Sequence, residues 1–348
     1  MRHAARAVAA AGRVPAEPRP GAGSDEDPLG RLRKPPQQER DGHLLVRGGH
    51  PGRVAAAVTR GSVLSLRQWA AASPSEEEAA VRAGVGATAP SVARLGDYLL
   101  GGKDNYAADR DLAERALAEA PVMSRLVQAE RAFLDHAAGR LAEAGLRQFL
   151  HLGCGLPVLG PPGAVSGNVA GIVRRTDPSC RVAYVDDDPM VVCHARALLA
   201  VDGGTRAICA DPREPAALLA HPELRQVIDL ERPVGVLLIG VLHFIADDPR
   251  GVVHALLDGL PAGSHVAITH MERTPGLDAA ARLLREAGVP FTPRSRDEVI
   301  AICGDLEMVG PYPANLPVAD CTRPAAAVGA AGIIGPMPLV GCIGRKPE

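Results

Sequence analysis

The sequence predicts an α/β protein whose core is a doubly wound, mostly parallel sheet of seven strands. Three observations predict this fold. Short apolar runs alternate with helical stretches from residue 148 onward, a glycine-rich turn follows the first run, and acidic residues follow the second. Of the 348 residues, 47% are hydrophobic, which suffices for a large buried core. In such a sheet, ligands bind at the carboxyl ends of the strands.

Residues 1–84 differ from the rest of the chain. They carry clusters of Pro, Gly and charged residues with poor periodicity, so we predict a disordered or low-complexity leader with short helices near 62–72 and 75–82. The part up to Arg60 is modestly basic. This favours a solvated leader, with a nucleic-acid-binding tail as the alternative. Residues 85–348 are predicted to form one domain that includes a helical cap over 89–145.

Helical periodicity and breaker residues define the elements of this domain. The cap is predicted to contain three helices, at 91–101, 107–120 and 122–144. Strands are then expected at 148–152, 181–185, 205–209, 234–239, 264–269, 306–309 and 339–343. Helices are expected between them at 167–175, 189–200, 214–220, 247–260, 277–287 and 295–303. This alternation predicts right-handed βαβ units with helices on both faces of the sheet.

Composition argues against several classes of protein. The formal charge is −2 and aromatic residues make up 3%, which argues against a nucleic-acid or membrane-surface partner. There is no apolar run long enough for a membrane span and no secretory signal pattern. The seven cysteines form no CxxC pair and no cluster with zinc spacing. We therefore expect a cytoplasmic protein without a metal site.

The sharpest local motif is His151-Leu-Gly-Cys-Gly155, directly after the first strand. Gly153 and Gly155 let the backbone turn tightly and approach a ligand without a Cβ. The helix that follows presents free N–H groups to the same place. This predicts a cofactor-binding turn, with an ordinary strand-to-helix turn as the alternative.

Acidic residues follow the next two strands. Asp186 and Asp187 are placed to bind the hydroxyls of a nucleotide ribose, whereas Asp188 is expected to cap the helix that starts at Pro189. Asp186 lies about 30 residues after the glycines, beyond the usual ~20, and a Pro-rich insert accounts for the excess. After the third strand, Asp211 is predicted to accept a hydrogen bond from an adenine amino group, or else to act as a turn or N-cap residue.

His243 follows the fourth strand in Gly240-Val-Leu-His-Phe244. This is the place where the fold puts groups beside cofactor and substrate, so His243 is a candidate general base or polar anchor. A buried, hydrogen-bonded structural histidine is the alternative interpretation.

The segment Ser91-Val-Ala-Arg-Leu-Gly-Asp-Tyr-Leu-Leu-Gly-Gly-Lys-Asp-Asn-Tyr106 resembles the N-terminal signature of a family of actinobacterial methyltransferases that use S-adenosylmethionine (SAM). That family was long catalogued as a domain of unknown function. Further matching segments follow in order up to residue 347, among them 131–134, 147–150, 153–157, 182–200, 232–234, 241–244, 257–263, 295–298 and 344–347. The resemblance implies a class I, Rossmann-like methyltransferase fold with SAM as cofactor.

The resemblance also implies roles for particular residues. Gly153 and Gly155 would line the methionine side of SAM, Asp186 would bind ribose, and Asp211 would lie near adenine. The Gly101–Asn105 segment, Tyr106 and Arg131 would close over the cofactor or the substrate. We accordingly expect His151, Gly153, Gly155, Asp186, Asp187, Asp211, Gly102 and Arg131 to bind the cofactor, and His243 and Tyr106 to face the acceptor as catalytic residues.

Two departures from the family pattern bear on cofactor binding. The family usually has an acid where His151 stands, so a negative charge near the sulfonium is missing here. A Pro- and Gly-rich insert, roughly 158–166, also separates the glycine turn from the following helix. The insert would either displace that helix or form a bulge that leaves the site intact.

These observations predict a SAM-dependent methyltransferase that acts on a small-molecule acceptor. The alternative is a catalytically inactive SAM-binding module that regulates a partner, which the two departures would explain. A nicotinamide-dependent oxidoreductase is a third candidate, but Val158 stands where its fingerprint needs a third glycine. The sequence indicates neither the acceptor atom nor an oligomeric state.

Overall fold

The computed structural model describes residues 86, 88–158, 168–316 and 337–348. The predicted leader with its two short helices, and the insert after Val158, lie outside the described residues. All described residues belong to one compact unit, and the fold below is the fold of that unit.

The sheet contains eight strands, most of them parallel. In chain order they are β1 (Gln148–Leu152), β2 (Arg181–Asp186), β3 (Thr205–Cys209), β4 (Gly235–Leu238), β5 (His265–Met271), β6 (Glu307–Met308), β7 (Ala314–Asn315) and β8 (Leu339–Arg345). Their order in the sheet is β3-β2-β1-β4-β5-β8-β6, and β7 also pairs with β8. β8 is antiparallel to each of the strands it pairs with, β5, β6 and β7, whereas β1 to β5 pair with one another in parallel.

The predicted number of seven strands was wrong because the outer row of the sheet is interrupted. β6 pairs with β8 at Arg345 and Gly344, and β7 pairs with the same strand further along, at Gly341 and Val340. Pro311 and Pro313 lie between β6 and β7 and have no N–H to donate to a strand ladder. The edge is therefore two short strands, and the predicted strand at 306–309 forms only the first of them.

Ten α-helices and one 3₁₀ turn surround the sheet in the described part of the chain. They are α3 (Val92–Leu99), α4 (Ala107–Glu119), α5 (Met123–Glu143), α6 (Val169–Val173), α7 (Pro189–Leu198), α8 (Pro215–Ala220), α9 (Pro222–Val227), η1 (Leu242–Phe244), α10 (Pro249–Asp258), α11 (Pro275–Glu286) and α12 (Arg296–Cys303). Nine of the α-helices lie where periodicity predicts them. The exception is α9, which follows α8 after the single residue His221; His221 caps it and Pro222 opens it.

Capping residues explain where several helices begin. The Asp188 carboxylate accepts a hydrogen bond from Met190 N at 2.8 Å, which confirms the predicted cap of α7. At α12, Ser295 Oγ accepts from Glu298 N, and the Glu298 carboxylate accepts from Ser295 N, so the two residues satisfy each other's free donors. These contacts need no tertiary partner, which is why the sequence marks these helix starts well.

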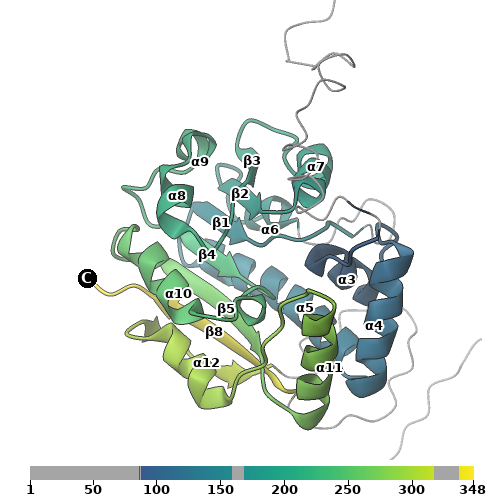
Figure 1. Ribbon diagram of the computed structural model, residues 1–348. Helices are drawn as coiled ribbons and strands as arrows, with labels where there is room; N and C mark the ends of the chain where they lie inside the picture. The colour runs from purple at the N-terminus through teal and green to yellow at the C-terminus, as the bar shows by residue number, and fades with distance from the viewer. Residues whose placement is uncertain (1–85, 87, 159–167, 317–336) are drawn as a thin grey trace, which may run out of the picture. The chain divides into compact units, whose positions relative to one another are not determined.

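Two apolar clusters, one on each face of the sheet, make up the core. One cluster joins strand residues such as Phe149 and Tyr184 to α4, α5, α6, α7 and α11. The other joins Leu150 and Val185 to α8, α9, α10 and α12. Neighbouring residues of one strand therefore point into opposite clusters, as the pleat requires. Figure 1 shows α10 and α12 in front of the sheet and α5 behind it.

The order of the strands determines where a crevice opens. After β1 the chain passes to α6 and β2 on one side, whereas after β4 it passes to α10 and β5 on the other (Figure 1). The segments that leave β1 and β4 therefore diverge at the carboxyl ends of two adjacent strands. This divergence leaves a crevice above β1 and β4, which is where open α/β sheets bind ligands.

Candidate active site

A cavity of about 440 Å³ opens at this crevice. Its polar walls come from the ends of the first four strands, and its remaining walls come from α3, α4, α5, η1 and α11. Of the residues singled out in the sequence, those that line it are His151, Gly153, Gly155, Asp186, Asp187, Asp211, Arg131 and His243. The structure thus brings together residues that lie up to 112 positions apart, from Arg131 to His243.

The glycine turn and the first acid are in direct contact. Gly155 N donates to Asp186 Oδ2 at 3.0 Å, and Asp188 N donates to Asp186 Oδ1 at 3.1 Å. Gly153 has a φ of +58°, and a Cβ there would lie 2.6 Å from Val241 Cγ2. Glycine is therefore required both by the left-handed backbone and by the close approach of the segment after β4.

The Asp186 carboxyl is almost buried, and burial raises its pKa to about 7, although the two backbone hydrogen bonds act in the opposite direction. A raised pKa means that the charged form is stabilised only in part by the free protein. Each oxygen keeps a lone pair, so a donor from a ligand would complete its hydrogen bonding.

The other two acids lie at the ends of β2 and β3 and share one arginine. Arg213 donates from Nη2 to Asp211 Oδ2 at 2.6 Å and lies 3.3 Å from Asp187 Oδ2. Burial raises the pKa of Asp211, but hydrogen bonds from the Arg213 side chain and backbone outweigh it, so the pKa lies below its usual range. Burial and the nearby Asp211 raise the pKa of Asp187. Asp211 also forms the turn before α8, through its carbonyl and Glu214 N.

His151 and Arg131 line the cavity on the other side of the glycine turn. His151 is 2% exposed, and its Nδ1 has no hydrogen-bond partner among the described residues. Burial and the nearby Arg131 lower its pKa to about 3, so its ring is neutral at physiological pH. In the described part of the chain the Arg131 guanidinium makes no hydrogen bond or ion pair.

His243 lies at the end of the cavity that η1 forms, beside a carboxylate that the sequence motifs did not single out. Its Nδ1 is 3.8 Å from Glu130 Oε1 and has no hydrogen bond among the described residues. Burial, His270 and Arg294 hold the pKa of His243 well below its usual range. The ring also packs against Phe291, at 5.4 Å between centroids.

One buried arginine holds the η1 segment in place. Arg294 donates to the carbonyl oxygens of Leu242, Ile245 and Ala246, and its Nη1 lies 2.9 Å from His270 Nε2. Three carbonyls of one short turn are therefore bound to a single guanidinium, whose planar fork suits this arrangement. The position of His243 in the cavity depends on this contact.

The part of the cavity away from the acids is apolar. It is lined by Leu95, Ala113, Ala116, Met123, Val127, Leu134, Ile239, Phe244, Met271, Leu284 and Phe291. The cavity thus has a polar end over β2 and β3 and an apolar end under α3, α4 and α11. Glu130, His243 and, on α3, Asp97 are ionisable residues that line the cavity beside these apolar side chains.

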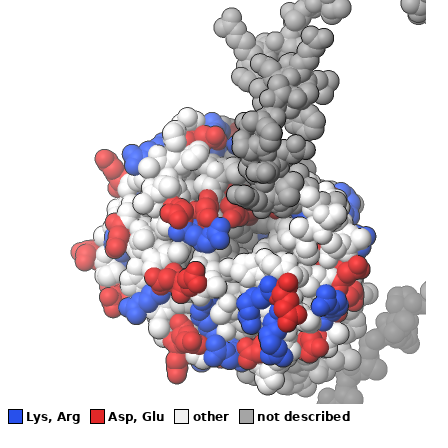
Figure 2. Space-filling model, viewed as in Figure 1, with Lys and Arg blue, Asp and Glu red and all other residues white. Residues whose placement is uncertain are grey.

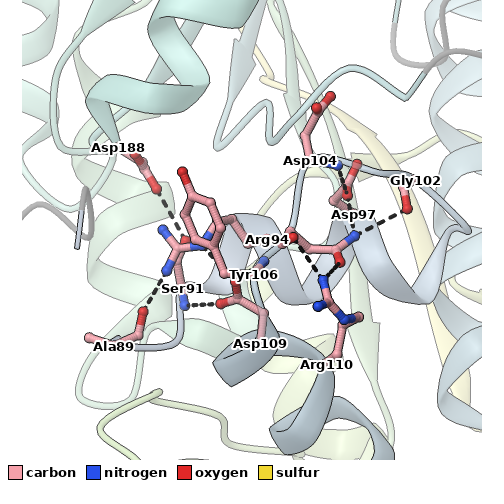
Figure 3. A network of polar contacts seen from close by, with 11 residues as sticks. Ala89, Ser91, Arg94, Asp97, Gly102, Asp104, Tyr106, Asp109, Arg110 and Asp188 are labelled. Carbon is pink, nitrogen blue, oxygen red and sulfur yellow. Dashed lines mark hydrogen bonds and ion pairs between the residues drawn. The ribbon is translucent and has the colours of Figure 1, made fainter. Parts of the chain in front are cut away.

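A network of polar contacts joins α3 to this site (Figure 3). Ser91 Oγ donates to Asp188 Oδ2 at 3.1 Å, which links the start of α3 to the acidic segment after β2. Arg94 Nε donates to Asp109 Oδ2 at 2.7 Å with both side chains fully buried, and Ser91 N donates to Asp109 Oδ1. This network positions α3 over the cavity.

Two predicted site residues do not line the cavity. The Tyr106 ring lies over the Arg94 guanidinium, 4.9 Å from it, and is 37% exposed (Figure 3). Gly102 lines a separate pocket of about 140 Å³. A Cβ at Gly102 would lie 1.9 Å from Asp97 Oδ1, so the close approach of this buried carboxylate requires glycine. The catalytic role predicted for Tyr106 and the cofactor role predicted for Gly102 gain no support from these positions.

Glu130 belongs to none of the sequence motifs, although the sequence carries a signal for it. Glu130 follows Leu126 by four positions and precedes Phe133 and Leu134 by three and four, on the buried face of α5. A carboxylate on the apolar stripe of an amphipathic helix breaks the hydrophobic pattern of the buried face. Asp97 gives the same signal in α3, where it is 2% exposed.

The surface and the rest of the described chain add few further candidates. On the face shown in Figure 2, Lys and Arg lie beside Asp and Glu, and neither sign of charge covers the face. Within the described ranges no helix could cross a bilayer, and no three metal-binding side chains gather at one point. Cytoplasmic location and the absence of metal and nucleic-acid partners stay predictions.

The fold, with its crevice at the ends of β1 and β4, is similar to that of the class I methyltransferases. The chain belongs to the S-adenosyl methyltransferase family, whose sequence pattern matches residues 78–317. Actinobacterial origin, which the resemblance also implied, stays a prediction.

Two solved structures resemble the chain closely. A protein from Thermobifida fusca YX, described as a methyltransferase, is 37% identical, with 76% of this chain and 98% of its own covered and a TM-score of 0.66. A DUF574 family protein from Streptomyces avermitilis is 33% identical, with 74% and 98% covered and a TM-score of 0.64. No curated protein matches the chain.

SAM is the cofactor of this family, and the residues present fit it. At Gly155 a Cβ would meet nothing within 4 Å, so this part of the turn leaves open space for a ligand at the backbone. Asp186, Asp187 and Asp211 offer carboxylate acceptors for ribose hydroxyls and an adenine amino group. His151 adds a buried ring nitrogen without a partner among the described residues.

Proposed function

We propose that this protein is a SAM-dependent methyltransferase that acts on a small, largely apolar acceptor. One observation carries the proposal. The glycine turn and Asp186 meet through the 3.0 Å hydrogen bond from Gly155, at the edge of a cavity that continues into an apolar space. The polar end suits a nucleoside, and the apolar end suits a molecule that buries little polar surface.

The acceptor would lie between the cofactor and the ring of Phe291. SAM supplies an electrophilic methyl group, so the protein needs mainly to hold a nucleophile in line with it, about 3–3.5 Å away. Val241 and the glycine turn shape one wall, and Phe244 and Phe291 shape the other. These walls also exclude water from the reacting atoms.

His243 is proposed to orient the acceptor and to receive its proton. Its depressed pKa makes it a weak base in the free protein. A weak base suffices for a hydroxyl acceptor, because an oxygen that has just gained a methyl group is an oxonium and gives up its proton readily. Arg294 acts as a positioning residue here, because it holds the turn that carries His243.

Isothermal titration with SAM tests cofactor binding, and transfer of isotope-labelled methyl groups from SAM into small-molecule extracts tests catalysis. Both are expected to be positive. Absence of binding at millimolar SAM would contradict the proposal. A matching rise of Tm with SAM, following RT ln(1 + [L]/Kd), and none with NAD would argue against an oxidoreductase.

The second candidate is a SAM-binding module without catalysis. The neutral, buried His151 in place of the usual family acid favours it, because the free cavity lacks a negative charge at that position. Binding of SAM together with no labelled product from any extract, in the wild type and in the variant His151→Asp, would favour this candidate.

A further inference from the structure

The cavity has a direction along the edge of the sheet. Asp211 follows β3, Asp186 ends β2, Gly153 follows β1 and Gly240 follows β4, and the sheet order is β3-β2-β1-β4. If the acids bind the nucleoside, as proposed above, the rest of SAM extends toward β1 and β4. That remainder carries an α-ammonium and an α-carboxylate.

The Glu130 carboxylate packs closely against the backbone at the end of β4. A Cβ on Gly240 would lie 3.0 Å from Glu130 Oε2, so this close approach depends on a glycine there. On its other side Glu130 Oε1 accepts from Thr269 Oγ1 at 2.9 Å, and the same hydroxyl accepts from Gly240 N at 2.8 Å. Two strands and α5 therefore fix this carboxylate in the cavity wall.

The charge of Glu130 has no matching cation in the described part of the chain. Lys and Arg side chains form no ion pair with it there, and its ionisable neighbours are the neutral His243 at 3.8 Å and Arg131 on its own helix. Burial raises the pKa of Glu130 to about 8. Burying a carboxylate without a cation is costly, and the packing of the fold gives no reason for it.

Arg131, the next residue, is in the complementary situation. Its guanidinium lines the cavity beside the glycine turn and makes no hydrogen bond or ion pair among the described residues. Burial lowers the pKa of Arg131, and the nearby carboxylates of Asp135 and Glu130 offset this only in part, without forming an ion pair with it. One wall thus offers an acid and a base that each lack an ion pair among the described residues. An α-amino acid group, with one positive and one negative end, would match both.

We propose that Glu130 and Arg131 together bind the amino-acid end of SAM, Glu130 at the α-ammonium and Arg131 at the α-carboxylate. The inference rests on the proposed function, since it takes the nucleoside to lie at the acids. It assigns to α5 the recognition of the charged end of the cofactor, while the strand ends recognise the nucleoside.

The experiment compares two ligands that share the nucleoside. S-adenosylhomocysteine (SAH) has the amino-acid end, and 5′-methylthioadenosine lacks it. Glu130→Gln keeps the size of the side chain and an oxygen for Thr269, and is expected to weaken SAH binding about 10- to 100-fold. Its affinity for methylthioadenosine should stay within about twofold of the wild type.

Further variants keep the test decisive. Arg131→Gln should show the same selective loss, and it remains informative if Glu130→Gln folds poorly in a thermal melt. Glu143→Gln and Arg140→Gln, on the exposed end of the same helix, should bind both ligands like the wild type.

An equal loss of affinity for both ligands, or no loss of affinity for SAH, would overturn the inference. Failure of the wild type to bind either ligand would instead refute the proposed function.

Discussion

At the ends of β2 and β3, the acids of the cavity are paired, whereas Glu130 near the end of β4 is buried without a cation. Asp187 and Asp211 share Arg213, and Asp186 accepts two backbone hydrogen bonds. Glu130 is held by the hydroxyl of Thr269, a neutral donor. In the free protein, the acids at the nucleoside end of the cavity therefore have more hydrogen-bond and ion-pair partners than Glu130 has at the amino-acid end.

This difference indicates that the two ends of the cavity contribute to ligand binding in different ways. Preformed hydrogen bonds keep the polar end in one shape, so little ordering is needed when a nucleoside binds. Unmatched charges at the other end make binding depend on a ligand that supplies the missing partners. Selectivity for a charged ligand then follows from the cost of leaving these groups unpaired.

The largest effect on cofactor binding is expected from Gly153→Ala, because both ends of the cavity depend on the turn. The new Cβ would lie 2.6 Å from Val241 Cγ2 at a φ of +58°. We expect a loss of about 2–3 kcal/mol of stability and roughly 100-fold in SAH affinity. Urea unfolding and calorimetry measure the two effects.

Two further variants sharpen this prediction. Gly203→Ala, where a Cβ meets open space, should match the wild type. Adding Val241→Ala to Gly153→Ala should restore part of the affinity, since it removes the clash but not the backbone strain. Full affinity in Gly153→Ala alone would show that the turn does not shape the site.

The second prediction uses pH to separate the two ends. In the unfolded chain Glu130 loses its proton near its ordinary pKa of 4.5, but in the folded protein it keeps it up to about 8. Wild-type stability therefore falls as pH rises between these values. Glu130→Gln escapes this cost, so above pH 8 it should exceed the wild type by roughly 2–5 kcal/mol more than it does at pH 4.

Asp186, whose pKa is raised to about 7, is present in both proteins and cancels in this difference. Urea unfolding at pH 4, 6 and 9 gives the comparison, with Glu143→Gln as a control that should stay parallel to the wild type. A difference that does not change with pH would mean that Glu130 is not protonated in the folded protein.

The smallest effect is expected for Tyr106→Leu, which tests the boundary of the site. The ring lies over Arg94 and outside the cavity. We expect a loss of about 0.5–1 kcal/mol in the thermal melt from the lost cation–π contact, with unchanged SAH affinity. A large loss of SAH affinity would show that Tyr106 takes part in ligand binding.

Much of the fold could be predicted from the sequence because local signals mark it. The apolar run at 234–239, the cap at Asp188 and the capping box at Ser295 all act within a few residues. The strand β6 was predicted at 306–309, but β7 was not, since its pairing with β8 depends on residues about 26 positions away. Local patterns do not encode such partners.

The site residues that lie directly after strands could be predicted from the sequence. Gly153, Asp186 and Asp211 line one cavity as expected from their places after successive strands. Glu130 was missed because it lies on a helix, and only the tertiary fold turns that helix toward β4. Tyr106 and Gly102 were assigned to the site by resemblance. In the structure, Gly102 packs against Asp97 and the Tyr106 ring packs against Arg94.

The cavity walls run from Pro90 to Phe291, and β8, which pairs along the whole of β5, comes later still. A ribosome would thus have released nearly all of this domain before the cavity could close. Nascent chains halted before β8 would lack the strand that pairs along β5, so we expect them to bind SAM more weakly than the complete domain. Added SAM is therefore not expected to help the first half of the chain to fold.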